Sequence, residues 1–91
     1  SDPLYTGVSD NVVTKAGTLE VRAEGLSSDE RLSFDVITLN GSTVHHADAE
    51  PQNRQWSTRV DAHDYAPGVY FVRIANGRFQ KVQRVVIAAK Q

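Results

Sequence analysis

The sequence predicts an all-β protein, an antiparallel β-sandwich of about seven strands. Its apolar residues recur with a period of two in short segments, which is the pattern of half-buried strands. No long window has the apolar stripe of an amphipathic helix, so no substantial helix is expected. Turn residues separate the segments at short intervals, and without helices each sheet must be covered by a second sheet. The expected architecture is therefore a sandwich of immunoglobulin-like size.

Four strands are expected in the first half of the chain. The run at 11–14 is a weak first strand, whereas 18–24 alternates cleanly between apolar and charged residues. Residues 32–39 alternate again and are expected to lie centrally in a sheet. Asn40-Gly41 then predicts a type I′ hairpin, because that turn needs positive φ at both central residues and Asn and Gly tolerate it best. Residues 42–47 are expected to return antiparallel.

Three further strands are expected in the second half. Residues 55–60 alternate, with Trp56 on the apolar face and therefore expected in the core. Residues 69–75 are the most strand-like run in the chain. Asn76-Gly77 predicts a second type I′ turn, and 79–88 follows as a long last strand.

Length and composition indicate one domain, with a flexible lead-in over residues 1–10 and the sandwich over residues 11–91. The chain has 91 residues, 40% of them apolar and 23% charged, and a formal net charge of −1. A chain of this length can form one compact core but not a deep substrate cavity as well. The sequence lacks the basic-then-apolar order of a signal peptide and any apolar run long enough for a membrane span. These features favour a mature fragment or a domain of something longer.

The residue types that most often carry chemistry do not assemble a site in this sequence. There is no cysteine, which excludes disulfides, a thiolate nucleophile and Cys-based zinc sites. His45 and His46 are adjacent on an expected strand, so their side chains leave opposite faces and cannot bind one metal ion together. His63 lies beside Asp61 and Asp64, but turns are rich in Asp because its side chain bonds the local backbone. We therefore expect no enzymatic activity and no metal or other cofactor.

Charge is distributed unevenly along the chain. From residue 66 to the end there are five basic residues and no acidic one, so this part carries +5 and the preceding part −6. One interpretation is a basic recognition strand, and the other is a solvated sheet face whose charges deter edge pairing. Nucleic acid is not expected as a partner, because the pI is about 6.2 and few aromatic residues interleave with the basic ones. The candidate recognition residues are Arg73, Arg78, Lys81, Arg84 and Lys90.

Several segments form a recognisable combination of motifs. Residues 66–74 read Ala-Pro-Gly-Val-Tyr-Phe-Val-Arg-Ile, followed by Asn-Gly at 76–77 and the basic strand at 81–87. Upstream, residues 36–44 form a hairpin run that ends Leu-Asn-Gly-Ser-Thr-Val, and 18–21 open an early strand. In this order the segments resemble the C-terminal sorting domains of the type IX (Por) secretion system of Bacteroidota, over nearly the whole chain.

The resemblance implies a folded signal domain that takes an attached protein through the periplasm and across the outer membrane, to the cell surface or the medium. The implied partners are the outer-membrane translocon, the shuttle proteins and a sortase that replaces the domain with a lipopolysaccharide anchor. The domain itself is not expected to insert into the membrane. Gly68 would permit a tight strand entry, and Tyr70 would be buried with its hydroxyl bonded to the backbone. The residues that match the family motifs, expected to be mainly structural, are Gly68, Val69, Tyr70, Asn40 and Gly41.

One segment departs from the family pattern. Members usually carry Tyr-Pro-Asn-Pro or a similar motif on the first strand, where this chain has Asn-Val-Val-Thr-Lys at 11–15. The departure favours a domain that is exported but retained on an accessory component of the surface attachment machinery. The alternative function is an immunoglobulin-like accessory module that binds carbohydrate or packs on a catalytic neighbour. The weak first strand also favours a strand-swapped homodimer.

Overall fold

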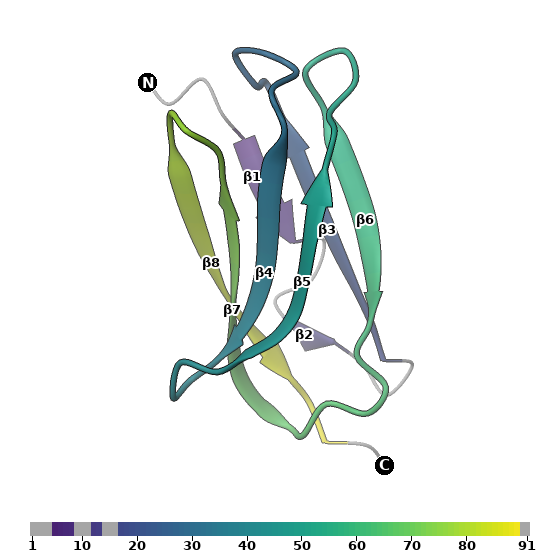
Figure 1. Ribbon diagram of the computed structural model, residues 1–91. Coiled ribbons are helices and arrows are strands. Elements are labelled where there is room, and N and C mark those ends of the chain that lie inside the picture. The colour runs from purple at the N-terminus through teal and green to yellow at the C-terminus, as the bar shows by residue number, and fades with distance from the viewer. Residues whose placement is uncertain (1–4, 9–11, 14–16, 90–91) are drawn as a thin grey trace.

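Two β-sheets pack face to face in the computed structural model, which describes residues 5–8, 12–13 and 17–89 (Figure 1). One sheet has three strands in the order β1-β3-β6, and the other has five in the order β2-β8-β7-β4-β5. None of the described residues forms a helix, and so none forms one that could cross a membrane. The strands are β1 (Tyr5–Val8), β2 (Val12–Val13), β3 (Thr18–Glu24), β4 (Leu32–Thr38), β5 (Thr43–Ala49), β6 (Trp56–Asp61), β7 (Gly68–Ala75) and β8 (Gln80–Ile87).

The strands β2 to β8 confirm the seven that the alternation predicts, and the fold is the expected immunoglobulin-like sandwich. The strand β3 has the expected bounds, and its residues Leu19, Val21 and Ala23 are buried. The strand β4 lies between β7 and β5, which confirms its central position. Charged residues of β3 alternate with the buried ones and face solvent, as a sheet covered on one face requires.

Two features of strand pairing in the N-terminal part differ from what the sequence predicts. The lead-in expected over residues 1–10 is corrected for residues 5–8, because Tyr5–Val8 forms β1 and pairs antiparallel with β3. A four-residue strand that contains Gly7 is too short to show alternation, and glycine has low β propensity. The second feature is that β2 pairs parallel with the end of β8, Val12 opposite Val86 and Val13 opposite Ile87, while all other strand pairs are antiparallel.

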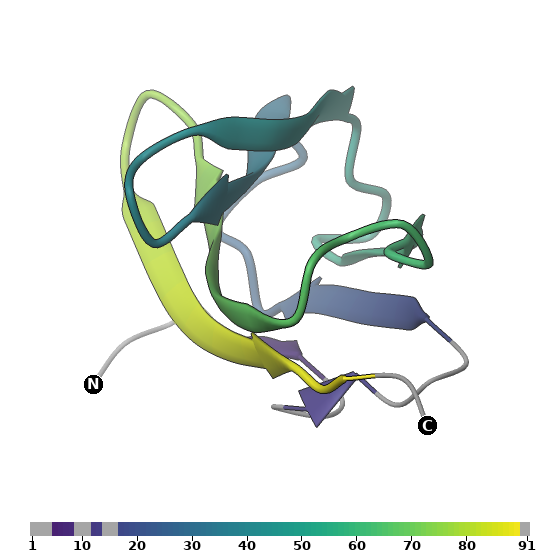
Figure 2. The same cartoon turned by 90° about the horizontal axis from the view of Figure 1, so that it is seen from below.

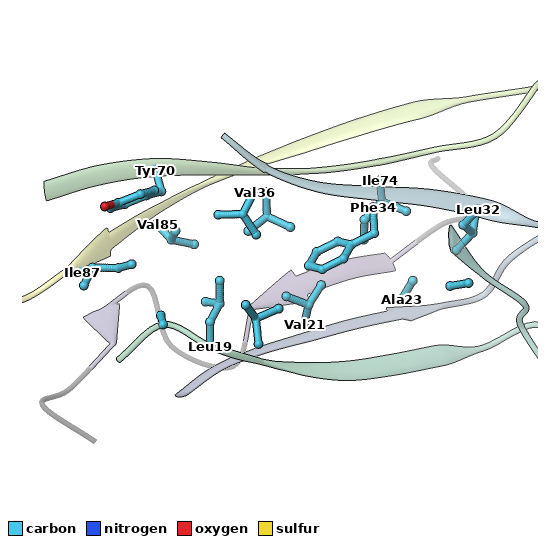
Figure 3. Close-up of a cluster of buried hydrophobic side chains, with 14 of the residues drawn as sticks. Leu19, Val21, Ala23, Leu32, Phe34, Val36, Tyr70, Ile74, Val85 and Ile87 are labelled. Atoms are coloured by element: carbon cyan, nitrogen blue, oxygen red, sulfur yellow. The ribbon is translucent and has the colours of Figure 1, made fainter. Parts of the chain in front are cut away.

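The core lies between the two sheets. The five-stranded sheet curls as it runs from β5 to β8, so that it partly wraps the smaller sheet (Figure 2). Phe34 is fully buried, and its ring points across the interior toward the sheet that carries Val21 (Figure 3). Trp56 packs edge-on against Phe34 with ring centroids 5.4 Å apart, but it is half-buried at the rim of the core rather than fully inside it.

Both predictions of a type I′ turn at Asn-Gly are wrong. At the first, Gly41 has a φ of 95° but Asn40 does not have positive φ, and the loop is a three-residue connection in which Gly41 N–H donates to Thr38 O at 3.0 Å. At the second, the Asn76 side chain accepts bonds from the N–H groups of Arg78 at 2.7 Å and Phe79 at 3.2 Å, an Asx turn.

The two-residue turn with positive φ at both centres lies elsewhere. Asn53 has a φ of 55° and Arg54 a φ of 62°, between Gln52 and Gln55, whose backbones exchange two hydrogen bonds of 3.0 and 3.1 Å. Tertiary contacts hold this turn in place. Arg54 N–H donates to Asp29 Oδ1 at 2.6 Å, and Leu26 N–H donates to Arg54 O at 3.1 Å.

Candidate recognition surface

Two motifs that are distant in the sequence meet at one end of the sandwich. The strand β4 pairs with β7 so that Thr38 lies opposite Tyr70, which brings the turn after β4 beside the entry to β7. A surface hollow of about 480 Å³ lies there, and its lining comes from residues 38–40 and 66–70. We call the surface formed by residues 38–41 and 66–70 the motif end; it is at the bottom of Figure 1.

The turn at the motif end exposes a large apolar side chain. Thr38 Oγ1 donates to Asn40 Oδ1 and accepts a bond from Ser42 N–H at 3.0 Å. Thr38 N–H donates to Ser42 O at 2.8 Å, which closes the loop at its base. With the turn held in this way, Leu39 projects into solvent with 69% of its surface exposed. Exposed apolar side chains grouped with others mark binding surfaces more often than isolated ones do.

The other side of the hollow is held by Tyr70. Its hydroxyl donates to Ala66 O at 2.6 Å, and the side chain is 6% exposed, which confirms the expected backbone anchor. The Tyr65 ring stacks on the Tyr70 ring with centroids 5.5 Å apart. Burial, and after it the neighbouring Tyr70 and Asp61, raise the pKa of Tyr65, so its phenol stays neutral at physiological pH. Gly68 has a φ of 146° at the strand entry, where a side chain would be strained.

A second hollow connects the motif end to the last strand. Its volume is about 460 Å³, and it shares Pro67 with the first hollow. Ile87, the last residue of β8, lines it together with the two alanines that follow. The motif end is therefore continuous with the surface next to the end of β8.

The outer face of the five-stranded sheet continues the apolar surface away from the motif end. In register across the sheet, Ile37 lies opposite Phe71 and Phe71 opposite Arg84. Val69 lies opposite Val86 in the neighbouring row. The apolar members of these rows are half-buried, while Arg84 is exposed. No residue that the structure describes makes an ion pair or hydrogen bond with the Arg84 guanidinium, which leaves a basic group beside an apolar stripe.

The structure does not gather the five candidate basic residues into one face. Arg73 donates to Asp35 Oδ2 at 3.0 Å, and Arg78 donates to Glu30 Oε1 at 3.1 Å, so both are paired with acids. Lys81 lies on the opposite face of β8 from Arg84, because side chains alternate along a strand. Lys90 lies outside the described residues. Of the five, Arg73 and Arg84 share the outer face, as diagonal neighbours on β7 and β8.

Asp35 is the one buried charged residue among those described, and it lies on the outer face of the five-stranded sheet. Its side chain is 8% exposed, with Arg73 Nη2 at 3.0 Å and His46 Nδ1 at 2.6 Å. Burial alone would raise the pKa of Asp35. The hydrogen bonds from His46 and Arg73, and the charge of Arg73, outweigh that effect, so the pKa of Asp35 lies below its ordinary value. The carboxylate therefore links β4, β5 and β7.

Asp35→Asn is expected to destabilise the protein at neutral pH by about 2 kcal/mol, since two charge-assisted bonds are weakened. Because the folded-state pKa is depressed, the stabilisation is present above the unfolded-state pKa and is lost as the pH falls below about 4. The difference in unfolding free energy between wild type and variant should therefore shrink as the pH falls below about 4. Urea unfolding at several pH values measures it, and a constant difference over that range would contradict the assignment.

The histidines are separated as the sequence predicts. His45 lies on the inner face with its ring 5.5 Å from Phe34, and His46 lies on the outer face beside Asp35. His63 N–H donates to Asp61 Oδ1 at 2.9 Å, a local turn bond. No group of three or more His, Asp or Glu in the described ranges could hold a metal ion.

The sequence placed Leu39 at the end of a strand and in the hairpin motif but did not mark it as a contact residue, although it is the most exposed large apolar side chain among the described residues. A leucine directly before Asn-Gly in a hairpin was the available signal, because turn residues lie outside the alternating pattern that buries apolar side chains.

The fold places this protein in the class of all-β, immunoglobulin-like sandwiches. Two solved structures share it, a thermostable endoglucanase from Alicyclobacillus acidocaldarius and AaCel9A in complex with a cellobiose-like isofagomine. Each has a TM-score of 0.66 and 18% sequence identity over 90% of this chain, which corresponds to 14% of the solved chain. At this identity the likeness concerns the fold alone. No curated protein sequence matches the chain.

A family model described as a secretion system C-terminal sorting domain matches residues 15–88. The chain belongs to that family, the C-terminal sorting domains of type IX secretion. It is a sorting signal that interacts with the type IX secretion machinery, and the protein that carries it is exported to the cell surface or secreted.

Proposed function

We propose that the motif end is the surface by which the type IX machinery recognises this domain. One observation carries the proposal: the two family motifs, separated along the chain, line a single exposed hollow beside Leu39. A purely structural motif would be expected to contribute to the core, as Tyr70 does. Leu39 and Pro67 instead lie at the surface, where they add apolar area for a partner.

In the proposed mechanism the domain acts by binding and carries out no reaction. The outer-membrane translocon and its shuttle proteins bind the motif end after the parent has entered the periplasm. Arg84 and the apolar stripe beside it extend the contact along β8, with Arg73 as the diagonal neighbour of Arg84 on the same face. An apolar centre with a charged edge is the usual composition of a protein interface.

The proposal includes the fate of the domain at the cell surface. Because residues 11–15 lack the usual first-strand motif, we propose that the sortase leaves the domain in place, on an accessory component of the attachment machinery. A strand-swapped homodimer, with the loops at residues 25–30 and 75–78 as hinges, belongs to the same proposal, since exchanged contacts equal those of the monomer. Mass spectrometry of the surface form tests retention, and light scattering over a concentration series tests exchange.

Leu39→Asp in the full-length parent is expected to reduce surface delivery by roughly tenfold, the effect of losing about 1.4 kcal/mol of binding. The substitution places a charge in the apolar contact but removes nothing from the core, because Leu39 is 69% exposed. Cell fractionation should then find the parent accumulating in the periplasm.

Val44→Asp is the matched control. Val44 is 40% exposed on β5 and does not line the hollow, so its replacement should leave delivery unchanged. Thermal unfolding of both variants verifies that the fold is intact. Normal delivery of a folded Leu39→Asp parent would refute the assignment of the motif end.

A further inference from the structure

A polar hollow lies at the opposite end of the sandwich from the motif end. Its volume is about 370 Å³, within the range of about 300–1,000 Å³ typical of small-ligand sites. The loop between β5 and β6 forms one wall, at the top of Figure 1, and β3 and the start of β6 form the other. The residues that line it include Trp56, Gln52, Asn53, Gln55, Arg22 and Glu24.

Trp56 is the aromatic residue among those that line this hollow. It is half-buried, with an edge-on contact to Phe34 on its core side and a place in the lining of the hollow on the other. Indole combines a flat apolar face with an N–H donor, which is why tryptophan is common where one side of a ligand is apolar and the other polar.

Three residues with primary amide side chains line the hollow together with Trp56. The side chains of Gln52, Asn53 and Gln55 are exposed, and none of them makes a hydrogen bond to any other residue that the structure describes. Each amide offers both donors and an acceptor without net charge. Hydroxyl groups likewise donate and accept, so a ring of amides suits a ligand that carries many of them.

The charges of the hollow are already compensated within the protein. Arg22 Nε lies 3.9 Å from Glu24 Oε2, and Arg31 Nη2 lies 3.3 Å from Glu50 Oε2. An anionic ligand would meet the two carboxylates, and a cation would compete with two arginines. The electrostatics therefore favour an uncharged ligand.

Tertiary contacts hold the backbone of the loop in an uncommon conformation. Asn53 and Arg54 both have positive φ, and for Arg54 this is unusual because its side chain crowds the backbone there. The bonds to Asp29 and Leu26 hold the turn in this conformation. Strained conformations that the surroundings enforce are concentrated at binding sites.

We propose that this hollow binds an uncharged saccharide, with a sugar ring against Trp56 and its hydroxyls bonded to the three amides. The site is independent of the recognition surface, because the two lie at opposite ends of the sandwich. A domain built in this way can bind a glycan while the motif end is engaged.

Titration of the 91-residue chain with neutral oligosaccharides tests the proposal. Trp56 is the one tryptophan in the sequence, so fluorescence excited selectively at tryptophan comes from this residue alone. The probes are maltohexaose, cellohexaose, xylohexaose and chitohexaose, with sialyllactose as an acidic comparison. At least one neutral probe is expected to give a saturable change below about 10 mM, in the range of weak single-site binding.

Asn53→Gly is the diagnostic variant. Glycine adopts positive φ without strain, so the variant keeps the turn while it removes one amide. Binding is expected to weaken by roughly tenfold, the effect of losing one or two hydrogen bonds to the ligand. Leu39→Asp, which acts at the motif end, should bind as wild type does.

Three results would overturn the proposal: no saturable change with any neutral probe, undiminished binding by Asn53→Gly, or binding of sialyllactose alone. Each leaves the sorting proposal untouched, since Asn53→Gly is expected to support normal surface delivery. Failure of Leu39→Asp to impair delivery would conversely leave the saccharide site untouched.

Discussion

Phe34→Ala is expected to destabilise the protein by about 4 kcal/mol, close to the whole stability of a marginal domain. Phe34 is fully buried and is the largest side chain of the core with less than 2% exposure. Its removal leaves a cavity between the sheets, and it also removes the ring contacts to Trp56 and His45. Aromatic pairs of this kind add about 1 kcal/mol beyond the area that they bury.

Urea unfolding monitored by circular dichroism measures the effect of this substitution. Phe71→Ala is the matched control, because Phe71 is the same residue type on the half-exposed outer face and its loss should cost roughly 1 kcal/mol. Equal losses from the two substitutions would contradict the assignment of the core to the space between the sheets.

Gly17→Ala is expected to cost about 3 kcal/mol, from backbone strain and a steric clash together. Gly17 has a φ of 77°, and a Cβ there would lie 2.9 Å from His63 Cα. His63 cannot move away easily, because the preceding Ala62 N–H donates to Gly17 O at 2.6 Å. Two segments, the start of β3 and the loop after β6, thus meet at a point that has no room for a side chain.

Gly41→Ala separates the strain from the clash. Gly41 has a φ of 95°, but a Cβ there would meet no atom within 4 Å, so the substitution should cost only about 1 kcal/mol. Thermal unfolding of both variants gives the comparison. If Gly17→Ala were no worse than Gly41→Ala, the close approach of His63 would not matter to stability.

The strands were predictable because alternation is a local property. The turns were not, as the two Asn-Gly pairs and the Asn53-Arg54 turn show. Asn and Gly permit positive φ but do not impose it, and the loop at residues 38–42 instead satisfies its polar groups through Thr38. The Asn53-Arg54 turn is selected by contacts with Asp29 and Leu26, which are distant in sequence. No local signal marks it.

The candidate site likewise has one part that was predictable from local sequence and another that was not. The anchor from Tyr70 to Ala66 was predictable, because it links residues four apart within one motif. The hollow beside Leu39 depends on the pairing of β4 with β7 and was not predictable from either motif alone. The charge count of residues 66–91 also predicted a basic surface that the fold does not form as a whole. Arg73 and Arg78 pair with acids that come from the earlier part of the chain.

The strand β2 pairs with only two residues of β8, which bears on how the domain avoids aggregation. In the described part of the chain β2 covers Val86 and Ile87, and the preceding residues of β8 form an open sheet edge. The run Val-Gln-Arg-Val-Val-Ile at 82–87 would be a strong cross-β segment without its arginine. Arg84 acts there as a gatekeeper, since a second copy that paired along this edge would have to desolvate the charge or bring like charges together. The side chain that is proposed to contact the secretion machinery would thus also oppose edge-to-edge pairing of two copies of the domain.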